Sequence, residues 1–376
     1  MDTPFALYIH IPFCATKCYY CAFNTDSFHK GQAQAYLQAL RTEMELYAPG
    51  VPPLKTIFLG GGTPSILSAE SLTQLFTDIW SSFQVGHDAE ITVECNPGTV
   101  DGEKLHVMRL AGVNRLSFGV QAMDNTILHQ IGRIHKVSEV IRSYQLARAS
   151  GFDNINLDLI FALPNQTIEQ WKHSVQEVIA LAPEHVSTYN LTLEEDTAFY
   201  EWWEAGKLKL ASNELEAEMY EIAIEMLAHK GYDHYEISNF AKPNRLAQHN
   251  LVYWNNAPYI GLGAGACGYL DGLRYSNIRG VQAYIDCLAQ RKKPIASSER
   301  LSERDEKSET IILGLRKREG ICHESYQRRF GEPITAAFGE VVQRWMDFQF
   351  LEWRNNYLRL TDCGLMLANE VFMPFL

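Results

Sequence analysis

The chain has 376 residues, of which 46% are hydrophobic and 21% charged, a composition typical of globular proteins with one large domain and a smaller one. Its formal net charge of -12 argues against binding along a phosphate backbone, because proteins that do so usually present a basic face. Eight cysteines are too few for a disulfide scaffold in a chain of this length, and three of them crowd into one segment, which favours a metal centre in a reducing compartment. We therefore expect a cytoplasmic protein that does not bind nucleic acid.

No apolar run in the sequence approaches the roughly 20 residues that are needed to span a bilayer. The amino terminus also lacks the basic region and the small-residue cleavage site of a signal peptide. These two features predict that the protein is neither secreted nor integral to a membrane.

Six short segments rich in β-branched and aliphatic residues recur in the first half of the chain, separated by stretches with a helical period. The segments span residues 6–11, 56–59, 90–95, 115–120, 154–160 and 185–191. Between the first two, Tyr36, Leu37, Leu40 and Met44 form an apolar stripe near the 3.6-residue period of a helix. Strands that alternate with helices predict a parallel sheet with right-handed crossovers. We therefore expect an α/β fold, namely a partial (β/α)6 barrel.

The rest of the sequence predicts a connecting segment and a smaller domain. Residues 214–228 have the pattern of a further helix, and the Gly-, Asn-, Tyr- and Pro-rich stretch up to about residue 280 is typical of loops over a barrel mouth. Charged helices at 302–315 and 334–350 then precede a short β-ribbon, which favours a small α+β, winged-helix-like domain. The predicted ranges are 1–230 for the barrel, 231–296 for the connecting segment and 297–376 for the accessory domain.

Cys14, Cys18 and Cys21 form a C-x3-C-x2-C loop directly after the first predicted strand. Barrel enzymes keep their active sites at the carboxyl ends of the strands, and such a loop can hold three irons of a [4Fe-4S] cluster while the fourth stays open. Two other interpretations are a zinc ion, for which His10 and His29 lie nearby, and a disulfide. Zinc sites usually pair C-x2-C units, and a disulfide would leave one of the three cysteines over, so the spacing favours the cluster.

The cysteine spacing, with an aromatic residue at Tyr20 before the last cysteine, resembles the signature of the radical S-adenosylmethionine superfamily. In that superfamily the open iron chelates the amino and carboxylate groups of the methionine moiety. Electron transfer from the reduced cluster then cleaves a carbon–sulfur bond and produces a 5'-deoxyadenosyl radical. The resemblance therefore implies two cofactors, the cluster and S-adenosylmethionine.

Polar groups that suit this nucleotide follow the other predicted strands. The turn Gly60-Gly61-Gly62-Thr63-Pro64 lets backbone groups approach a ligand closely. Glu94, Gln121 and Asp158 stand at or near strand ends, where a carboxylate or an amide can accept from an ammonium group or from ribose hydroxyls, and Arg133 can pair with a carboxylate. Each residue alone is better explained by a helix cap or a satisfied strand end, but together they favour a nucleotide site.

Several motifs in order resemble the oxygen-independent coproporphyrinogen III oxidase-like family. They are Tyr8-Ile9-His10-Ile11-Pro12-Phe13-Cys14, the glycine turn, Gly119-Val120-Gln121, Gly132-Arg133 and Asn156-Leu157-Asp158-Leu159-Ile160. The resemblance runs from about Tyr8 to the carboxyl terminus and implies a radical S-adenosylmethionine type of barrel. By position it assigns nucleotide binding to Tyr8, Tyr20, Gly61, Gly62, Thr63, Glu94, Gln121, Arg133 and Asp158.

The sequence departs from the true oxidase in two places. Phe23 stands where the oxidase pattern has a fourth cysteine, and seven residues precede Tyr8 where the oxidase has an extension thought to help hold substrate. These departures weaken the alternative activity, which is radical decarboxylation of coproporphyrinogen III to protoporphyrinogen IX.

A further motif, His249-Asn250-Leu251-Val252-Tyr253-Trp254, resembles the HNxxYW motif of the HemW branch of this family, whose members act as haem chaperones. An imidazole can ligate haem iron, and flanking aromatic rings can pack on a porphyrin. This resemblance implies haem as cargo bound at His249, Tyr253 and Trp254, recipient haem proteins such as respiratory-chain enzymes, and a homodimer. Cys267 stands where a related turn usually carries histidine, and it could be a soft thiolate ligand or a small buried residue. Of the two, we expect burial.

Overall fold

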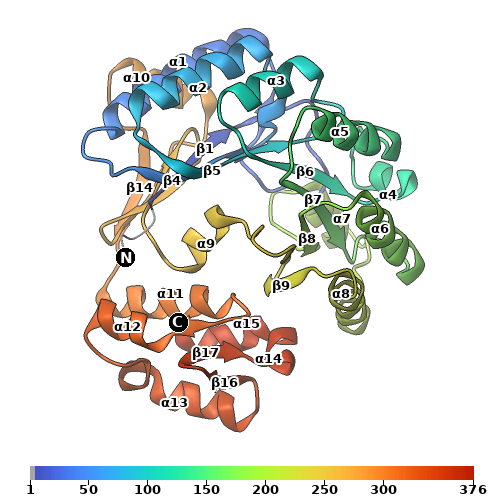
Figure 1. Cartoon of the computed structure of the whole chain (residues 1–376), viewed down its shortest axis with the longest axis vertical. Helices are drawn as coiled ribbons and strands as arrows, with labels where there is room; N and C mark the ends of the chain where they lie inside the picture. The colour runs from blue at the N-terminus through green and yellow to red at the C-terminus, as the bar shows by residue number, and fades with distance from the viewer. Residues whose placement is uncertain (1–4) are drawn as a thin grey trace.

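The computed structural model describes residues 5–376, so the first four residues of the predicted barrel range lie outside the described residues. Its centre is a curved sheet of twelve strands in the order β14-β13-β12-β11-β1-β4-β5-β6-β7-β8-β10-β9. Figure 1 shows helices along the outer side of this sheet and a separate helical region, coloured orange to red, on the opposite side. The molecule is therefore an open barrel with a C-terminal domain facing its inner side.

Six neighbouring strands of the sheet run parallel and follow one another in chain order. They are β1 (Ala6–Ile11), β4 (Leu54–Gly61), β5 (Val85–Cys95), β6 (Arg115–Gln121), β7 (Ile155–Phe161) and β8 (His185–Asn190). They coincide with the six segments predicted from the sequence, so the α/β class and the partial barrel are confirmed. The carboxyl ends of all six strands therefore meet at one edge of the barrel.

Further strands extend the sheet at both edges, and those between residues 259 and 277 lie where the sequence predicts loops. They are β9 (Asp233–Glu236), β10 (Asn239–Ala241), β11 (Tyr259–Leu262), β12 (Cys267–Leu270), β13 (Leu273–Asn277) and β14 (Ile295–Arg300). Strand β11 pairs in parallel with β1, and β12 to β14 continue as an antiparallel meander. The prediction of loops is thus wrong for residues 259–277. Pairing with an existing sheet edge stabilises strands that are too short and glycine-rich to be recognised locally.

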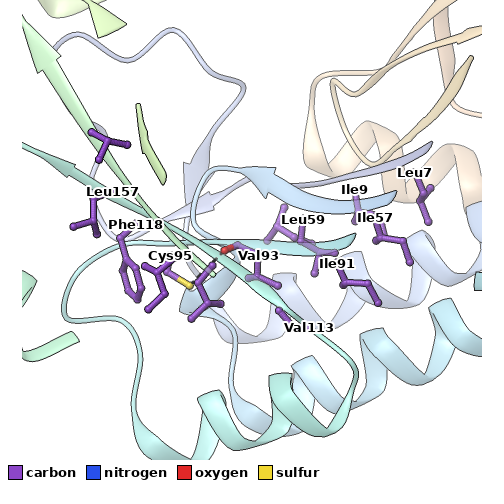
Figure 2. Close-up of a cluster of buried hydrophobic side chains, with 14 of the residues drawn as sticks. Leu7, Ile9, Ile57, Leu59, Ile91, Val93, Cys95, Val113, Phe118 and Leu157 are labelled. Atoms are coloured by element: carbon purple, nitrogen blue, oxygen red, sulfur yellow. Dashed lines mark hydrogen bonds between the residues drawn. The ribbon is translucent and has the colours of Figure 1, made fainter. Parts of the chain in front are cut away.

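Alternation along the parallel strands separates an apolar face from a polar one. Figure 2 shows Leu7, Ile9, Ile57, Leu59 and neighbouring side chains from β5, β6 and β7 in one buried cluster. Burial of each such aliphatic side chain contributes about 1.5–3 kcal/mol. Because successive side chains of a strand point to opposite faces, the residues between these positions must face the concave side. We call this concave side the lumen; its polar side chains form the site described below.

Ten helices accompany the sheet between residues 30 and 289. They are α1 (Lys30–Tyr47), α2 (Ala69–Ser82), α3 (Gly102–Leu110), α4 (Asn125–Gln130), α5 (Val137–Ala149), α6 (Ile168–Leu181), α7 (Ala198–Glu204), α8 (Asn213–Ala228), α9 (Gln248–Trp254) and α10 (Val281–Ala289). Helix α8 confirms the helix predicted at 214–228. Unlike the outer helices, α9 lies on the concave side of the sheet, between the sheet and the C-terminal domain (Figure 1).

The C-terminal domain combines five helices with a small antiparallel sheet in the order β15-β17-β16. Its elements are α11 (Glu303–Leu315), β15 (Ile321–Cys322), α12 (His323–Phe330), α13 (Ile334–Asp347), β16 (Leu351–Arg354), β17 (Tyr357–Leu360), α14 (Asp362–Met366) and α15 (Ala368–Phe372). The hydroxyl of Ser302 accepts from the backbone N–H of Asp305 and so caps α11. This arrangement agrees with the predicted α+β domain, whereas the boundaries after residues 230 and 296 stay predictions.

A buried carboxyl group joins α1 to the added strands. Glu43 is fully buried and accepts hydrogen bonds from the backbone N–H of Gly263 (2.7 Å), the hydroxyl of Tyr284 (2.5 Å) and the amide of Asn277 (2.6 Å). Burial raises the pKa of Glu43 to about 7, although these donors counteract the shift. The joint fixes the turn between β11 and β12, which also contacts the cysteine loop.

We expect the variant Glu43→Gln to remove one pH-dependent part of the free energy of unfolding. The folded pKa of Glu43 is raised above its unfolded value of 4.5, so the stabilisation is fully present below pH 4.5 and is lost as the pH rises through about 7. The free energy of unfolding of the parent, relative to that of the variant, should fall by about 3 kcal/mol as the pH rises over this range. Urea unfolding of both proteins at a series of pH values measures it, and parallel pH profiles would contradict the assignment.

Candidate functional site

The cysteine loop begins and ends at one small β-pair at the carboxyl end of β1. Strands β2 (Phe13–Cys14) and β3 (Asp26–Ser27) run parallel, with Cys14 opposite Ser27, and so close the loop at its base. The three thiols are free and partly exposed. Cys14 Sγ lies 3.5 Å from the hydroxyl of Thr63, and Arg133 Nη1 lies 3.5 Å from Cys18 Sγ. The loop thus presents three sulfurs that the rest of the barrel contacts from two sides.

His10 supports this loop from below. Its Nε2 donates to the backbone carbonyl of Asn24 (2.7 Å), so its Nδ1 is the acceptor for the Tyr8 hydroxyl (2.9 Å). Asn24 in turn donates to the carbonyls of Ala264 and Arg279, both at 2.9 Å. A Cβ on Gly61, whose φ is +108°, would stand 2.4 Å from the His10 ring, so glycine is required there for close packing. His10 therefore buttresses the loop and does not offer a free nitrogen to a metal.

A cavity of about 500 Å³ connects the cysteine loop with the lumen. Eleven of the twelve residues predicted to hold the cluster and the nucleotide line it. They are Cys14, Cys18, Cys21, Tyr20, Gly61, Gly62, Thr63, Glu94, Gln121, Arg133 and Asp158. Residues from a loop, five strands and the segment after α4 thus converge on a single space, which is the expected arrangement at the carboxyl ends of barrel strands.

Tyr8 is the predicted nucleotide residue that the structure does not place on this cavity. Its hydroxyl is engaged by His10, and its ring lies 6.2 Å from that of Phe58, which does line the cavity. A nucleotide contact for Tyr8 stays a prediction. The observed contacts place Tyr8 behind the cavity wall as a support for His10.

Asn96 connects the glycine turn to Arg133. Its amide donates to the Thr63 hydroxyl (2.7 Å), and its carbonyl accepts from Arg133 Nη2 (2.7 Å). The same guanidinium also donates to the backbone carbonyl of Gly119. Sequence reasoning missed Asn96, although its position two residues after Glu94, at the end of β5, could have identified it. The network orients Arg133 toward the cysteine loop.

The pKa values of Glu94 and Asp158 are both raised. Burial raises the pKa of Glu94 to about 8, with repulsion from Asp158 as the second cause, while the backbone N–H of Gly61 donates to Glu94 Oε2 (3.1 Å) and opposes the shift. Burial also raises the pKa of Asp158, which accepts from Asn156 (2.7 Å) and Ser117 (3.2 Å). Two carboxyl groups desolvated together in a cavity suit a cationic ligand, whose charge would restore their ionised forms.

Two residues that line this cavity also carry buried polar atoms without a partner. Gln121 has a left-handed backbone with φ of 70°, unusual for a residue with a side chain, and its Oε1 is buried without a hydrogen-bond partner, as is Nε of Arg133. Backbone strain of this kind persists mainly where the surrounding structure imposes it for function. Unsatisfied donors and acceptors beside three thiols fit a polar ligand bound against a metal cluster.

His249 is buried in the first turn of α9, with 1% of its surface exposed. Its Nδ1 lies 2.8 Å from the hydroxyl of Thr56 and its Nε2 lies 2.8 Å from that of Tyr253. Burial, aided by the positive charge of Arg115, lowers the pKa of His249 to about 3, so the imidazole is neutral. Both ring nitrogens are therefore occupied. Phe58, which lines the cavity, stacks on the His249 ring with the two ring centroids 5.1 Å apart.

Trp254, at the end of the same helix, lies at the joint with the C-terminal domain. The guanidinium of Arg316 covers its ring at 4.4 Å, and Lys317 donates to Asn255 (2.5 Å). Of the 249–254 motif, Asn250 is the residue that reaches the cavity. The motif thus links the barrel wall, the cavity and the C-terminal domain.

Two residues singled out in the sequence are exposed. Phe23, which replaces the fourth cysteine of the oxidase pattern, lines the cavity and keeps 68% of its surface exposed. Cys267 is exposed as well, so the prediction that it is buried is wrong. The backbone of Cys267 packs against Gly261, where a Cβ would lie 1.7 Å from the Cys267 carbonyl oxygen, and this leaves its side chain outside the contact.

Among residues 5–376, no three histidine, cysteine or acidic side chains are arranged to hold a single metal ion. A cubane cluster does not require such convergence, because each of its thiolates binds a different iron. No helix in the same range is both long and apolar enough to cross a membrane.

Comparisons with known proteins agree with the geometry. The family model of the radical SAM superfamily matches residues 8–178, and that of the HemN C-terminal domain matches residues 301–367. A Bacillus subtilis (strain 168) protein named heme chaperone HemW is 41% identical over 372 residues, which cover 98% of each chain. A protein of the same name from Lactococcus lactis subsp. lactis (strain IL1403) is 38% identical, over 100% of this chain and 98% of its own.

A solved structure shows the same fold. The coproporphyrinogen III oxidase HemN of Escherichia coli, described as a radical SAM enzyme, superposes with a TM-score of 0.86 at 23% identity. The superposition covers 100% of this chain and 90% of the oxidase. The fold, the convergent cysteine site and the full-length relatives together show that this chain belongs to the radical SAM superfamily and, within it, to the family of the heme chaperone HemW proteins.

Proposed function

We propose that the protein is a haem chaperone of the cytoplasm that delivers haem to haem proteins, including respiratory-chain enzymes. Cys14, Cys18 and Cys21 would hold a [4Fe-4S] cluster, S-adenosylmethionine would bind its open iron, and haem would be the cargo. One observation carries this proposal. Asn250 of the 249–254 motif lines the same cavity as the three cysteines and the two buried carboxyl groups, so a cargo site and a nucleotide site would adjoin.

In this proposal, different residues around the cavity would hold different parts of the nucleotide. Glu94 and Asp158 would accept from the cationic and hydroxyl groups of S-adenosylmethionine, and Asn96 would keep Arg133 aimed at the cysteine loop. The glycine turn allows backbone groups to approach the methionine moiety. When bound, the cluster supplies a coordination site and an electron, whereas the chain itself positions the ligand and excludes water.

Haem binding at His249 would require a local rearrangement. A neutral imidazole is the form that ligates iron, and the low pKa of His249 provides it. In the described conformation Nε2 is held by Tyr253 and the ring is shielded by Phe58. Ligation therefore needs α9 to shift so that haem iron replaces the Tyr253 hydroxyl.

Spectroscopy of anaerobically prepared protein tests the cofactors. We expect iron–sulfur absorption and a paramagnetic signal of the reduced cluster that changes when S-adenosylmethionine is added, because the nucleotide would occupy the open iron. A protein that takes up no iron under anaerobic reconstitution would remove the basis of the proposal.

We expect His249→Ala to weaken haem binding and Tyr253→Phe to strengthen it. Loss of the axial nitrogen should reduce affinity roughly tenfold or more, and removal of the competing hydroxyl should raise affinity roughly 2- to 10-fold, the equivalent of one hydrogen bond. Titration followed in the Soret band measures both. His249→Gln is a second variant that keeps side-chain volume and hydrogen bonding without a strong iron ligand, and haem affinity equal to the parent in both histidine variants would exclude His249 as the ligand.

The oxidase alternative makes a different prediction. If the protein converted coproporphyrinogen III, the reconstituted protein would form protoporphyrinogen IX with reductant and S-adenosylmethionine, and such turnover would overturn a purely carrier role.

We also propose that the protein forms a homodimer. Light scattering after size exclusion should then show a mass that doubles when cluster and nucleotide are bound. Transfer of labelled haem from this protein to an apo-cytochrome tests delivery directly.

A further inference from the structure

Arg115 is a buried cation that the sequence analysis did not assign. It begins β6, lines the cavity and exposes only 2% of its surface. Its Nε has no hydrogen-bond partner, and among residues 5–376 no carboxylate lies at ion-pair distance from its guanidinium. Burying a charged group without a partner costs about 2–5 kcal/mol of desolvation free energy. A protein that keeps such a group therefore usually uses it to bind a ligand.

Arg115 lies deeper in the lumen than the groups near the cysteines. Along β6 the cavity-lining residues are Arg115, Ser117, Gly119 and Gln121, which alternate with buried apolar residues. At about 3.3 Å per residue, Arg115 lies about 13 Å along the strand from Gly119, whose carbonyl contacts Arg133. The hydroxyl of Thr92, the residue paired with Arg115 on β5, is likewise buried without a partner. Arg115 thus lies at the inner end of the cavity, with a second unsatisfied polar group beside it on β5.

The acidic groups around Arg115 are committed elsewhere. Both oxygens of Glu90 accept from the backbone N–H groups of Gln248 and His249 at the start of α9. Glu94 and Asp158 pair with Ser117 and Gly119, two and four residues further along β6 than Arg115. They feel its charge, which opposes the rise that burial causes in the pKa of both, but they accept their hydrogen bonds from Gly61, Asn156 and Ser117. The guanidinium therefore remains available for a carboxylate that the protein itself does not provide.

We propose that Arg115 binds a carboxylate of the tetrapyrrole cargo, that is, one propionate arm of haem. This inference rests on the proposed function and names how the cargo is recognised. The methionine moiety has a single carboxylate, which the proposed function places on the open iron near the cysteine loop, so it does not reach Arg115. A guanidinium fork matches a carboxylate with two parallel hydrogen bonds, and Phe58, Ile160 and Tyr189 give the same cavity an apolar wall for a macrocycle.

The inference is tested by comparing haem with haem dimethyl ester, in which both propionates are esterified. The parent should bind haem roughly 10- to 100-fold more tightly than the ester, the equivalent of a charge-assisted hydrogen bond. Arg115→Gln should bind both ligands with the affinity that the parent has for the ester, and Arg115→Lys should fall between. A variant Arg115→Gln that keeps the preference for haem would overturn the inference, as would an equal loss of affinity for both ligands.

Two further measurements separate this inference from the proposed function. Arg115→Gln should keep its affinity for S-adenosylmethionine, and a parallel loss would assign the guanidinium to the nucleotide instead. Sodium propionate should raise the melting temperature of the parent but not of Arg115→Gln, and equal shifts would overturn the carboxylate site. A parent that responds to propionate but binds no haem would refute haem carriage and leave the anion site in place. Arg115→Gln should fold, because it replaces an unpaired buried charge with a neutral group.

Discussion

Replacing Cys18 with alanine should abolish iron–sulfur binding. Each thiolate of the loop would hold a different iron, so two remaining cysteines cannot retain a cubane with one open position. Cys18 also contacts Arg133, so its loss removes a link between the loop and the barrel. Iron content after anaerobic reconstitution should fall from about four atoms per chain to near zero, together with the visible absorption and the paramagnetic signal. Cys14→Ala and Cys21→Ala should behave in the same way.

The chain offers matched controls for this experiment. Cys363, exposed in α14 of the C-terminal domain, and Cys287, in α10, are free thiols that do not line the cavity. Cys363→Ala and Cys287→Ala make the same chemical change and should keep the full iron content. Full iron in Cys18→Ala, or equal loss in the control variants, would refute the assignment of the cluster to this loop.

Glu94→Gln should weaken S-adenosylmethionine binding about 10- to 100-fold, because a charge-assisted hydrogen bond contributes about 1.5–3 kcal/mol. The substitution keeps the shape and an oxygen that can accept from Gly61, so the fold should persist. The pKa of about 8 means that Glu94 is largely protonated at pH 7 before the ligand binds. The permanent positive charge of the sulfonium would favour the ionised carboxylate, and binding at pH 7 should therefore release protons in the parent.

Calorimetry in buffers of different ionisation enthalpy measures this release together with the affinity. The variant should release fewer protons as well as bind more weakly, a signature that mere loss of packing would not produce. Glu194→Gln is the matched control, since Glu194 is exposed at the cavity rim and a solvent-screened charge contributes little. Proton release and affinity equal to those of the parent would remove Glu94 from the nucleotide site.

Local patterns in the sequence were sufficient to predict the parallel strands of the barrel and the position of the cysteine loop. The six parallel strands follow from apolar segments that alternate with helical periods, and the strand-then-cysteine order places Cys14 at the functional end of the barrel. Alternation also predicts that Glu94 and Asp158 face the lumen, because every second residue of a strand lies on the same side. The same rule applied to β6 would have identified Arg115, which precedes the recognised Gln121 by six residues.

Contacts between distant segments could not be predicted in this way. The strands at residues 259–300 form because they pair with the edge of β1, and Asn96 becomes important because Thr63 and Arg133 meet at it. The motif around His249 suggests a haem ligand. Whether its ring nitrogens are free, however, depends on the hydroxyls of Thr56 and Tyr253. Such partners are set by packing, and no periodicity within one segment specifies them.

The sequence by itself determined that this chain carries three cysteines at a cluster spacing on a parallel α/β barrel of the radical S-adenosylmethionine type. Short-range periodicity and motif spacing are sufficient for that, since both are local properties of the chain. Only the tertiary structure decided that His249 is shielded, that Cys267 is exposed and that an unpaired Arg115 lies at the inner end of the cavity. Burial and hydrogen-bond partnership depend on which surfaces fold against each other, and they decide which of these groups remains available to a ligand.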